Sequence, residues 1–354
     1  MSIKLLIGAS DNKMQYMKKF SEYLEKFDVN SKLVLDVEIC NGFPSKNITQ
    51  WINPFKKFNL LIKSFKPDAV FVDRQTQFGI AAIKSGIPLL MQLRGNYWDE
   101  INWAKKNGSI KDKLILSIKE KTAEKCFKDS EIIFPFSNHL AEITKEKYPD
   151  KKIEVFHDGL EIKEWYKEEP MNFKHPCIGL LQNASIWKKS QEMILLKDIL
   201  GKFPDVTFYW AGDGIYRQKI LDVLGKYKNF KWLGSLEYPN KVRKFLSSID
   251  IYLLLSGYDT FGMTIIEAEI MEVPVIATNV GGTSEAMINK KTGFLVKQGD
   301  INELEEKINL LLNDENLAKE IGSSGRKFVI ENFSWENTVK KFIQNMKNGI
   351  NSDK

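Results

Sequence analysis

Residues 256–285 of this chain read SGYDTFGMTIIEAEIMEVPVIATNVGGTSE, which places two carboxylates, Asp259 and Glu267, on either side of a Phe-Gly turn. The surrounding pattern predicts a buried strand over 251–255, its exit loop over 256–262, a helix over 264–271 and a second strand over 274–278. A β-loop-α-β unit of this kind is typical of a parallel sheet. Because ligands bind at the carboxyl ends of such strands, we expect Asp259, Glu267 and the amides of 262–264 to converge on one edge. A polyhydroxylated, anionic ligand would suit that edge.

Taken singly, the same residues also fit ordinary structural roles. Thr264 and Glu267 have the spacing of a capping box, in which Glu267 bonds only to the backbone at the helix start. Asp259 would satisfy a turn, and Gly281-Gly282 would form the entry to the next helix. Their occurrence together, in this order, favours a binding site.

The combination resembles the retaining glycosyltransferases of the GT-B fold, most closely glycosyltransferase family 4. That family's signature has an acid, Phe-Gly, a second acid eight positions after the first, a Pro-Val strand and Gly-Gly-x-x-Glu, and this chain has each of them. Further elements follow in the family's order along nearly the whole chain: AGDG at 211–214, WLG at 232–234, TGFLV at 292–296 and FSWE at 333–336. The resemblance implies an α/β protein with two Rossmann-like, doubly wound domains that face each other across a cleft.

The broad properties agree with a two-domain cytoplasmic enzyme. A chain of 354 residues is long for one hydrophobic core and comfortable for two. Cys40, Cys126 and Cys177 are odd in number and share no metal-type spacing, which indicates a reducing compartment and no structural zinc. The opening apolar run is too short for a signal segment, and no apolar stretch reaches the roughly 18 residues of a membrane span.

Alternating hydrophobic periods predict the domain organisation. Short strand-like runs at 3–7, 33–39, 69–72, 88–92 and 131–135 are separated by helical patterns such as 14–27 and 78–84. A charged stretch at 161–174 breaks this rhythm before a new strand at 177–181. We therefore expect, with the resemblance, an acceptor-side domain over 1–165 and a nucleotide-sugar-binding domain over 172–332. The helix within 333–354 is expected to cross back onto the first domain.

Positive charge is concentrated in parts of the chain, whose net charge is +6. Residues 101–126 carry seven lysines against three acids among apolar residues, and 51–65 places apolar residues at helical spacing between lysines. Anionic headgroups attract such lysines, so both segments are candidates for peripheral contact with the inner face of a membrane. Core-packing helices with a solvated charged face would give the same patterns, and that alternative stays open. Nucleic acid is disfavoured, because no zinc finger, RNA-recognition motif or aromatic platform interleaved with arginine occurs.

Sugar transfer requires positive charge beside the departing phosphate. By the resemblance, Lys189 supplies it, in the place of the family's Lys-Gly pair. Asn183 stands where the family usually has an Arg, and an amide donates hydrogen bonds without charge, so the leaving group would depend on Lys189 and backbone amides. Without the resemblance, Lys189 would fit a surface lysine beside Lys188.

The two acids have different implied roles. By the resemblance, Glu267 receives the ribose hydroxyls of the nucleotide and Asp259 receives hydroxyls of the donor sugar. Asp259 is one methylene shorter than the Glu that is commoner in the family, which leaves the identity of the sugar open. The other expected donor contacts are Phe261, the backbone amides of Gly262, Met263 and Thr264, and the base-bordering Leu236 and Lys241.

Arg94 is the expected contribution of the first domain, at a position where many relatives have a His facing the donor. An Arg holds a phosphate or sugar oxygen but cannot shuttle a proton at neutral pH. The sequence His157-Asp158-Gly159 matches an interdomain turn, which favours a turn over catalysis. Retaining enzymes of this class are thought to use the leaving phosphate as base, so no dedicated side-chain base is expected.

The leading interpretation is a retaining, hexosyltransferase-like, metal-independent glycosyltransferase of polysaccharide or glycoconjugate biosynthesis. It would move a sugar from a nucleotide-diphosphate donor, such as a UDP- or GDP-sugar, to a glycan, lipid-linked or small polyol acceptor, with no cofactor and no metal. A second interpretation is a catalytically weak or inactive relative that binds a nucleotide sugar or a partner protein, because Asn183, Asp259 and Arg94 all depart from the family pattern. A same-fold sugar-nucleotide epimerase is disfavoured by the arrangement of the Phe-Gly, Pro-Val and Gly-Gly elements.

Overall fold

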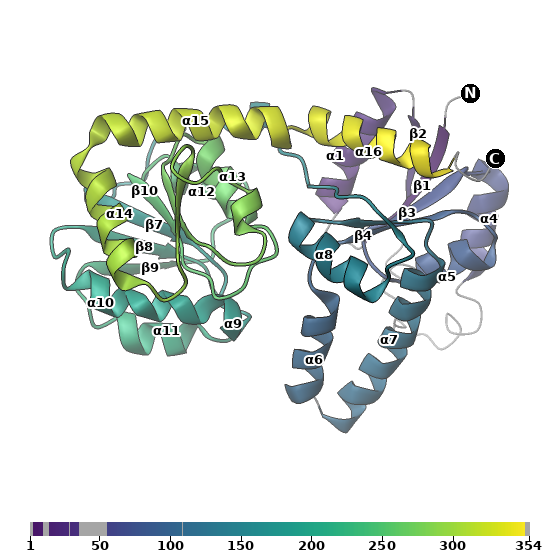
Figure 1. Cartoon of the computed structure of the whole chain (residues 1–354), viewed down its shortest axis with the longest axis horizontal. Helices are drawn as coiled ribbons and strands as arrows, with labels where there is room; N and C mark the ends of the chain where they lie inside the picture. The colour runs from purple at the N-terminus through teal and green to yellow at the C-terminus, as the bar shows by residue number, and fades with distance from the viewer. Residues whose placement is uncertain (1–2, 10–13, 28, 35–54, 108, 351–354) are drawn as a thin grey trace. The chain divides into compact units, whose positions relative to one another are not determined.

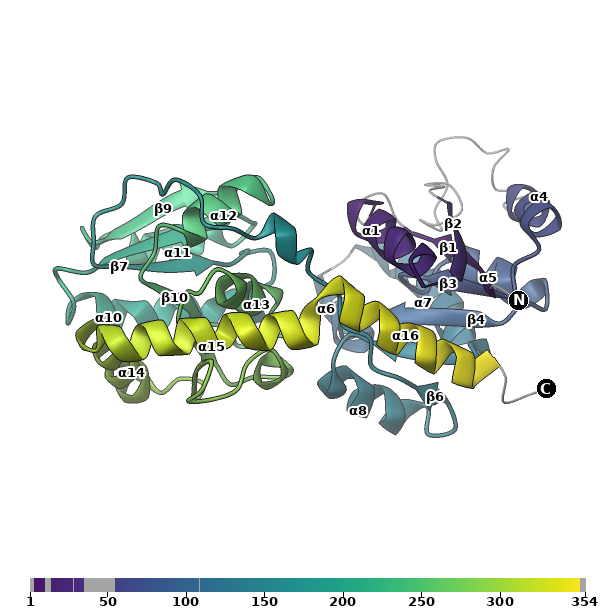
Figure 2. The same ribbon diagram turned by 90° about the horizontal axis from the view of Figure 1, so that it is seen from above.

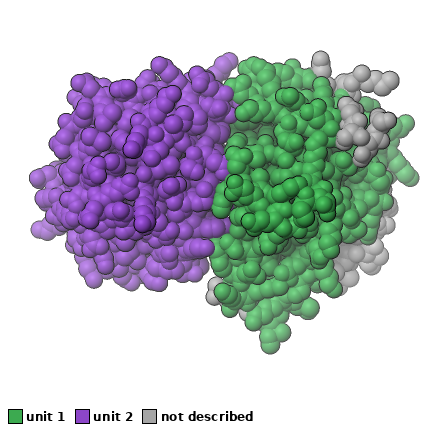
Figure 3. Space-filling model, in the orientation of Figure 1, with its two compact units in different colours: residues 1–159, 335–354 green, residues 160–334 purple. Residues whose placement is uncertain are grey.

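The computed structural model describes residues 3–9, 14–27, 29–34, 55–107 and 109–350 (Figure 1). The chain divides into two compact units, coloured separately in Figure 3. Unit 1 comprises residues 1–159 and 335–354, and unit 2 comprises residues 160–334. The division therefore falls just before the charged stretch 161–174, which belongs to unit 2, and the C-terminal segment belongs to unit 1.

Unit 1 is built on a parallel sheet with the strand order β2-β1-β3-β4-β5-β6 among the described residues. Its strands are β1 (Ile3–Gly8), β2 (Val29–Val34), β3 (Ala69–Val72), β4 (Leu89–Leu93), β5 (Ile132–Pro135) and β6 (Lys152–Ile153). Its helices are α1 (Met14–Glu25), α4 (Phe55–Phe65), α5 (Gln77–Lys84), α6 (Tyr97–Asn107), α7 (Ile110–Asp129), α8 (Asn138–Lys147) and α16 (Trp335–Ile350). The predicted strand at 33–39 begins earlier, at Val29, and its last residues, 35–39, lie outside the described residues.

Hydrophobic clusters cover both faces of this sheet. Each strand contributes to both clusters, because its successive side chains point to opposite faces. In β3, Ala69 and Phe71 join one hydrophobic cluster, which includes residues of α1 and α16. Val70 and Val72 join a second cluster, which includes residues of α5 and α7. The continuous apolar runs of these strands are explained by this two-sided burial.

Unit 2 repeats the architecture, with the strand order β12-β11-β10-β7-β8-β9 and parallel pairing throughout. Its strands are β7 (Cys177–Leu181), β8 (Thr207–Ala211), β9 (Phe230–Gly234), β10 (Ile251–Leu254), β11 (Val275–Thr278) and β12 (Gly293–Val296). Its helices are α9 (Trp187–Ser190), α10 (Lys197–Leu200), α11 (Arg217–Leu224), α12 (Asn240–Leu246), α13 (Met263–Ile270), α14 (Ile301–Asn313) and α15 (Glu315–Phe333). The predicted β-loop-α-β unit is thus β10, α13 and β11, and Figure 2 shows α13 beside α15.

The direction of chain progression reverses in the middle of the unit 2 sheet. From β7 the chain moves outward through β8 and β9, then returns to the other side of β7 with β10 and continues to β11 and β12. Ligands of open parallel sheets bind where two neighbouring strands continue in opposite directions. The exit loops of β7 and β10 therefore define the edge at which a ligand site is expected.

Candidate active site

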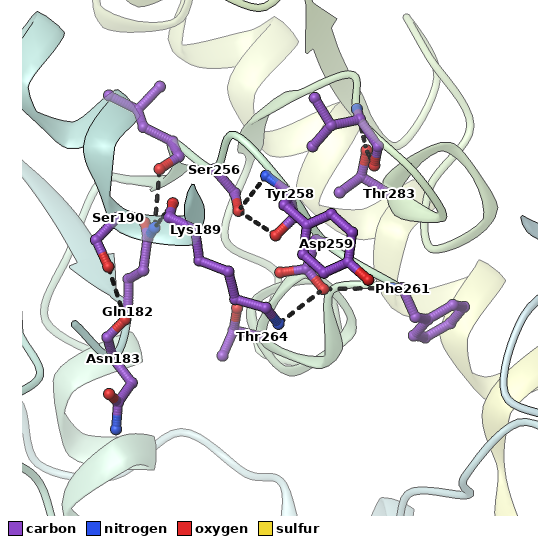
Figure 4. Close-up of polar contacts among 12 residues, drawn as sticks. Gln182, Asn183, Lys189, Ser190, Ser256, Tyr258, Asp259, Phe261, Thr264 and Thr283 are labelled. Atoms are coloured by element: carbon purple, nitrogen blue, oxygen red, sulfur yellow. Dashed lines mark hydrogen bonds and ion pairs between the residues drawn. The ribbon is translucent and has the colours of Figure 1, made fainter. Parts of the chain in front are cut away.

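Gln182 joins the two loops at this switch point. It follows β7 directly, and its buried amide nitrogen donates hydrogen bonds to the carbonyls of Lys189 (2.9 Å) and Leu255 (2.8 Å) (Figure 4). One side chain thus fixes the distance between the loop after β7 and the loop after β10. Gln182 was not predicted as a site residue, because a glutamine after a strand carries no sequence signature of its own.

Lys189 and Asp259 meet across this junction. The Nζ atom of Lys189 lies 3.8 Å from Oδ1 of Asp259, and Figure 4 shows the lysine side chain reaching toward the carboxylate. Both side chains are partly exposed, so each keeps a face for a ligand. At this separation the pair is a loose one, and the ammonium is available to a second anion.

The loop after β10 is held in shape by its own polar groups. Ser256 donates from its hydroxyl to the carbonyl of Tyr258 (2.8 Å), and its backbone amide donates to the hydroxyl of Thr278 (3.1 Å). Asp259 accepts a hydrogen bond from the backbone amide of Phe261 (3.3 Å). These bonds fix the position of Asp259 by backbone geometry rather than by packing of its side chain.

Gly262 starts helix α13 in a way that leaves backbone donors for a ligand. Its φ of 91° lies in the left-handed region, which a glycine adopts without steric cost. As the cap it offers no side chain, and the first amides of any α-helix, here those of Met263 and Thr264, have no partner within the helix. The positive end of the helix dipole therefore adds to the charge of Lys189 at this edge.

The capping-box interpretation of Thr264 and Glu267 is wrong. Helix α13 begins at Met263 with Gly262 as its cap, so Glu267 lies beyond the first turn. The Thr264 hydroxyl instead accepts a hydrogen bond from the Tyr252 hydroxyl (2.6 Å). Glu267 therefore does not cap the helix, which leaves it open to a role in the site.

Glu267 is a buried carboxyl, with 6% of its surface exposed. Burial raises its pKa to about 8, and a hydrogen bond from Tyr238 opposes that rise. Tyr238 lies in the 235–239 loop, which also carries Leu236. Its hydrogen bond to Glu267 therefore links this loop to α13. The carboxylates of Glu267 and Asp259 both act on Tyr252, whose pKa is raised first by burial and then by these two charges. The two predicted acids therefore lie around one tyrosine.

The remaining expected donor contacts have mixed surroundings. The Phe261 ring is buried against Phe333, with ring centroids 5.3 Å apart, so only its backbone is suited to meet a ligand. Asn183 is exposed, and its side-chain oxygen accepts a hydrogen bond from the amide of Ser185 (2.8 Å). Leu236 is half-buried after β9, and Lys241 is exposed in the first turn of α12.

Arg94 has a well-defined place inside unit 1. Its guanidinium forms an ion pair with Asp158 and lies over the Tyr16 ring, 4.4 Å from the centroid. Asp158 also accepts a hydrogen bond from Gln92 (3.3 Å). Burial acts to lower the pKa of Arg94, but the Asp158 carboxylate and Tyr16 raise it above the ordinary value. Asp158 and Tyr16 both belong to unit 1, and the predicted contact of Arg94 with a donor stays a prediction.

The fold resembles that of solved glycosyltransferases over nearly the whole chain. Sucrose-phosphate synthase from Thermosynechococcus elongatus has a TM-score of 0.74 at 16% identity, covering 98% of this chain and 99% of that chain. The glycosyltransferase from Rickettsia africae gives 0.74 at 19% identity, covering 99% of each. Together with the two parallel sheets, these likenesses confirm the predicted α/β class and the GT-B fold.

The sequence comparison assigns a domain within unit 2. Residues 161–328 match the family described as Glycosyl transferases group 1, so this chain carries a domain of that family. The uncharacterized glycosyltransferase MJ1178 of Methanocaldococcus jannaschii is 30% identical over 60% of this chain and 58% of its own length. The N-acetyl-alpha-D-glucosaminyl L-malate synthase of Bacillus anthracis is 26% identical over the same shares. The matched part therefore spans a little over half the length of these two relatives. Assignment to family 4 in particular stays a prediction.

Proposed function

We propose that this protein is a retaining glycosyltransferase that binds a nucleotide-diphosphate sugar at the carboxyl edge of the unit 2 sheet. The observation that supports it best is the Lys189–Asp259 pair at the switch point, 3.8 Å apart, on two loops that Gln182 joins through the carbonyls of Lys189 and Leu255. The amides at the start of α13 and the buried Glu267 lie on the same β10-α13 segment. A nucleotide-diphosphate sugar contains a charged diphosphate and two sugar rings. The lysine and the backbone amides suit the diphosphate, and the two acids suit hydroxyls of the rings.

The proposed chemistry uses these groups in distinct roles. Lys189 and the amides of Met263 and Thr264 stabilise the negative charge that grows on the departing phosphate. Asp259 orients the donor sugar by accepting its hydroxyls, and Glu267 accepts ribose hydroxyls. As the bond from the anomeric carbon to the phosphate oxygen breaks, the acceptor oxygen bonds to that carbon on the same face and its proton passes to the phosphate. The proposal needs no metal and no side-chain base.

The donor is tested by thermal stabilisation of the purified protein with UDP, GDP, ADP and their sugar conjugates, without added metal. UDP is the first to try, because HepE of Anabaena was solved in complex with UDP and glucose. A shift with one nucleotide, followed by slow release of sugar from its conjugate, supports the transferase. Binding without release of sugar would favour the inactive, donor-binding alternative, and no shift at millimolar concentrations would count against a donor site.

The site assignment is tested by a pair of variants on one helix. Above pH 8, where the Glu267 carboxyl is ionised, Glu267→Gln should abolish the nucleotide-induced shift, because it removes the carboxylate proposed to accept the ribose hydroxyls. Glu269→Gln is the matched control: Glu269 is equally buried on α13 but lies against Gly325 of α15. If both variants kept the shift, Glu267 would not be a donor ligand.

We further propose that the α6–α7 hairpin of unit 1 contacts an anionic membrane surface, which would suit a lipid-linked acceptor. Ile110, Leu114 and Ile118 form a stripe along α7 with 88%, 66% and 48% of their surfaces exposed. Exposed lysines flank this stripe at positions 111, 113 and 121. Figure 1 shows the two helices projecting from the unit 1 sheet. Apolar side chains beside lysines are the pattern of an interfacial helix.

The second candidate segment, 51–65, has different surroundings. Residues 51–54 lie outside the described residues, and in α4 Phe58 is fully buried while Leu61, Ile62 and Phe65 pack against the core. The described part of this segment therefore follows the core-packing alternative. Within the described residues no helix is long and apolar enough to cross a bilayer.

Cosedimentation with lipid vesicles tests the hairpin. Wild-type protein should bind vesicles containing an anionic phospholipid and bind neutral vesicles weakly, and salt should reduce the binding. Ile110→Ser combined with Leu114→Ser should reduce binding several-fold. Ile215→Ser, which removes an equally exposed apolar residue from unit 2, should bind like wild type. Equal binding by all three proteins would exclude the hairpin as the contact surface.

A further inference from the structure

A second cluster of ligand-type side chains lies at the amino edge of the unit 2 sheet. His175 and Cys177 stand at the start of β7, and Asp250 directly precedes β10, the strand that pairs with β7. Because the strands are parallel, the proposed donor site lies at the opposite, carboxyl edge of the same two strands. The cluster therefore belongs to no part of the transferase site.

The atoms of this cluster have the separations of metal ligands. Nδ1 of His175 lies 2.8 and 3.0 Å from the two carboxylate oxygens of Asp250, and 3.6 Å from Sγ of Cys177. One ligand atom from each residue can be chosen so that all lie within 4.8 Å of one another. Tetrahedral Zn²⁺ with bonds of about 2.0 Å to N or O and about 2.3 Å to S places its ligands roughly 3.3 to 3.6 Å apart. Small side-chain movements would thus suffice to enclose an ion.

The surroundings hold two of the three groups in place. Asp250 accepts a hydrogen bond from the backbone amide of Cys177 (2.7 Å), which links the two strand starts. The Cys177 thiol donates to the carbonyl of Ser248 (3.3 Å). Cys177 is buried, whereas His175 and Asp250 are exposed, so water has access to a fourth coordination position. The bond from the Cys177 amide to Asp250 can persist and orient this ligand when an ion arrives, whereas the thiol gives up its bond to Ser248 with its proton.

We propose that His175, Cys177 and Asp250 bind a divalent transition-metal ion, with Zn²⁺ the best match to one nitrogen, one sulfur and one oxygen ligand. On binding, Nδ1 of His175 exchanges its hydrogen bond to Asp250 for a bond to the metal, and the ring proton resides on Nε2. The Cys177 thiol releases its proton to solvent as the sulfur–metal bond forms. The ion would connect the segment that enters β7 to the start of β10 and so stabilise unit 2, in contrast to the expectation from the cysteine spacing that the chain holds no structural zinc.

Cobalt spectroscopy of the full chain tests the proposal, because a thiolate bound to Co²⁺ gives a near-ultraviolet charge-transfer band. One equivalent of Co²⁺ should produce this band in the wild type and in Cys126→Ser, whose thiol lies in unit 1. Cys177→Ser should lose the band. Absence of the band in the wild type, or its persistence in Cys177→Ser, would overturn the proposal.

A second measurement covers the case in which Cys177→Ser fails to fold. His175 and Asp250 are exposed, and Asp250→Asn keeps an oxygen for the backbone amide of Cys177. His175→Gln and Asp250→Asn should each weaken Zn²⁺ binding, measured calorimetrically, by at least roughly tenfold. Unchanged affinity in both variants would place the bound zinc elsewhere and refute the site.

Discussion

At the scale of single residues, the buried Glu267 carboxyl predicts a pH-dependent stability. Its pKa is raised from 4.5 to about 8 by burial, so between these pH values the folded protein holds one proton more than the unfolded chain. The free energy of unfolding should therefore fall as the pH rises from about 4.5 to about 8, and then level off. Urea denaturation at pH 5, 7 and 8.5 should show a smaller decline for Glu267→Gln than for the wild type. The buried Glu269 is present in both proteins, so parallel declines would refute the assignment to Glu267.

The position of Lys189 predicts an effect on catalysis rather than on folding. Lys189→Met keeps much of the apolar stem but removes the charge beside Asp259, so turnover should fall by about 10²- to 10³-fold. Because the pair is loose and partly exposed, its loss should change the free energy of unfolding by less than about 1 kcal/mol. Lys188→Met is the control, because it removes a neighbouring ammonium that lies over the same Tyr258 ring, 4.9 Å from its centroid against 6.0 Å for Lys189. Equal losses of kcat in the two variants would show a general charge effect instead.

At the scale of elements, the site depends on close packing between two loops. A Cβ atom on Gly282 would lie 2.2 Å from the carbonyl oxygen of Thr260, in the loop that carries Asp259. Gly282→Ala should displace that loop, lower the stability by about 1 to 3 kcal/mol and weaken nucleotide binding. Gly201→Ala, where nothing lies within 4 Å, should leave both properties unchanged. Nucleotide titrations and denaturation of both variants would decide whether the two loops are coupled.

Elements with strong hydrophobic periods were predicted well from the sequence, and their junctions less so. The strand at 177–181 and the β10-α13-β11 unit are confirmed, because buried parallel strands require continuous apolar runs. Helix α13 starts earlier than expected, because the left-handed Gly262 is its cap and a backbone angle cannot be read from sequence. No pattern in the sequence indicates that Arg94 pairs with Asp158, 64 positions away, or that Gln182 joins two loops. Such pairings depend on the strand order.

At the scale of the whole molecule, the C-terminal helix α16 completes the core of unit 1. Trp335, Val339, Phe342, Ile343 and Met346 are buried there. At about 1.5 to 3 kcal/mol for each buried side chain, their loss rivals the total stability of a domain. A chain ending at Ser334 should therefore have an unfolded unit 1 and a folded unit 2.

Limited proteolysis with mass spectrometry would check this prediction. Unit 1 of the truncated chain should be digested rapidly, while a fragment near residues 160–334 persists and still binds nucleotide. A chain ending at Ile350 is the control and should resist digestion like the full chain. Protection of residues 55–159 in the shorter chain would show that unit 1 folds without α16.

The two places where the chain passes between its units are neighbours. Leu160 and Ser334 form a parallel bridge at the edge of unit 2, and a Cβ atom on Gly159 would lie 2.6 Å from the Cα atom of Trp335 in unit 1. In topological terms, unit 2 is an insertion into unit 1 with its two ends adjacent. Without the insertion, Gly159 could be joined to Trp335 to give a continuous unit 1. A gene segment encoding 160–334 could thus be exchanged as a cassette, and, if the proposed function holds, recombination at these two codons would combine the donor preference of one chain with the acceptor preference of another.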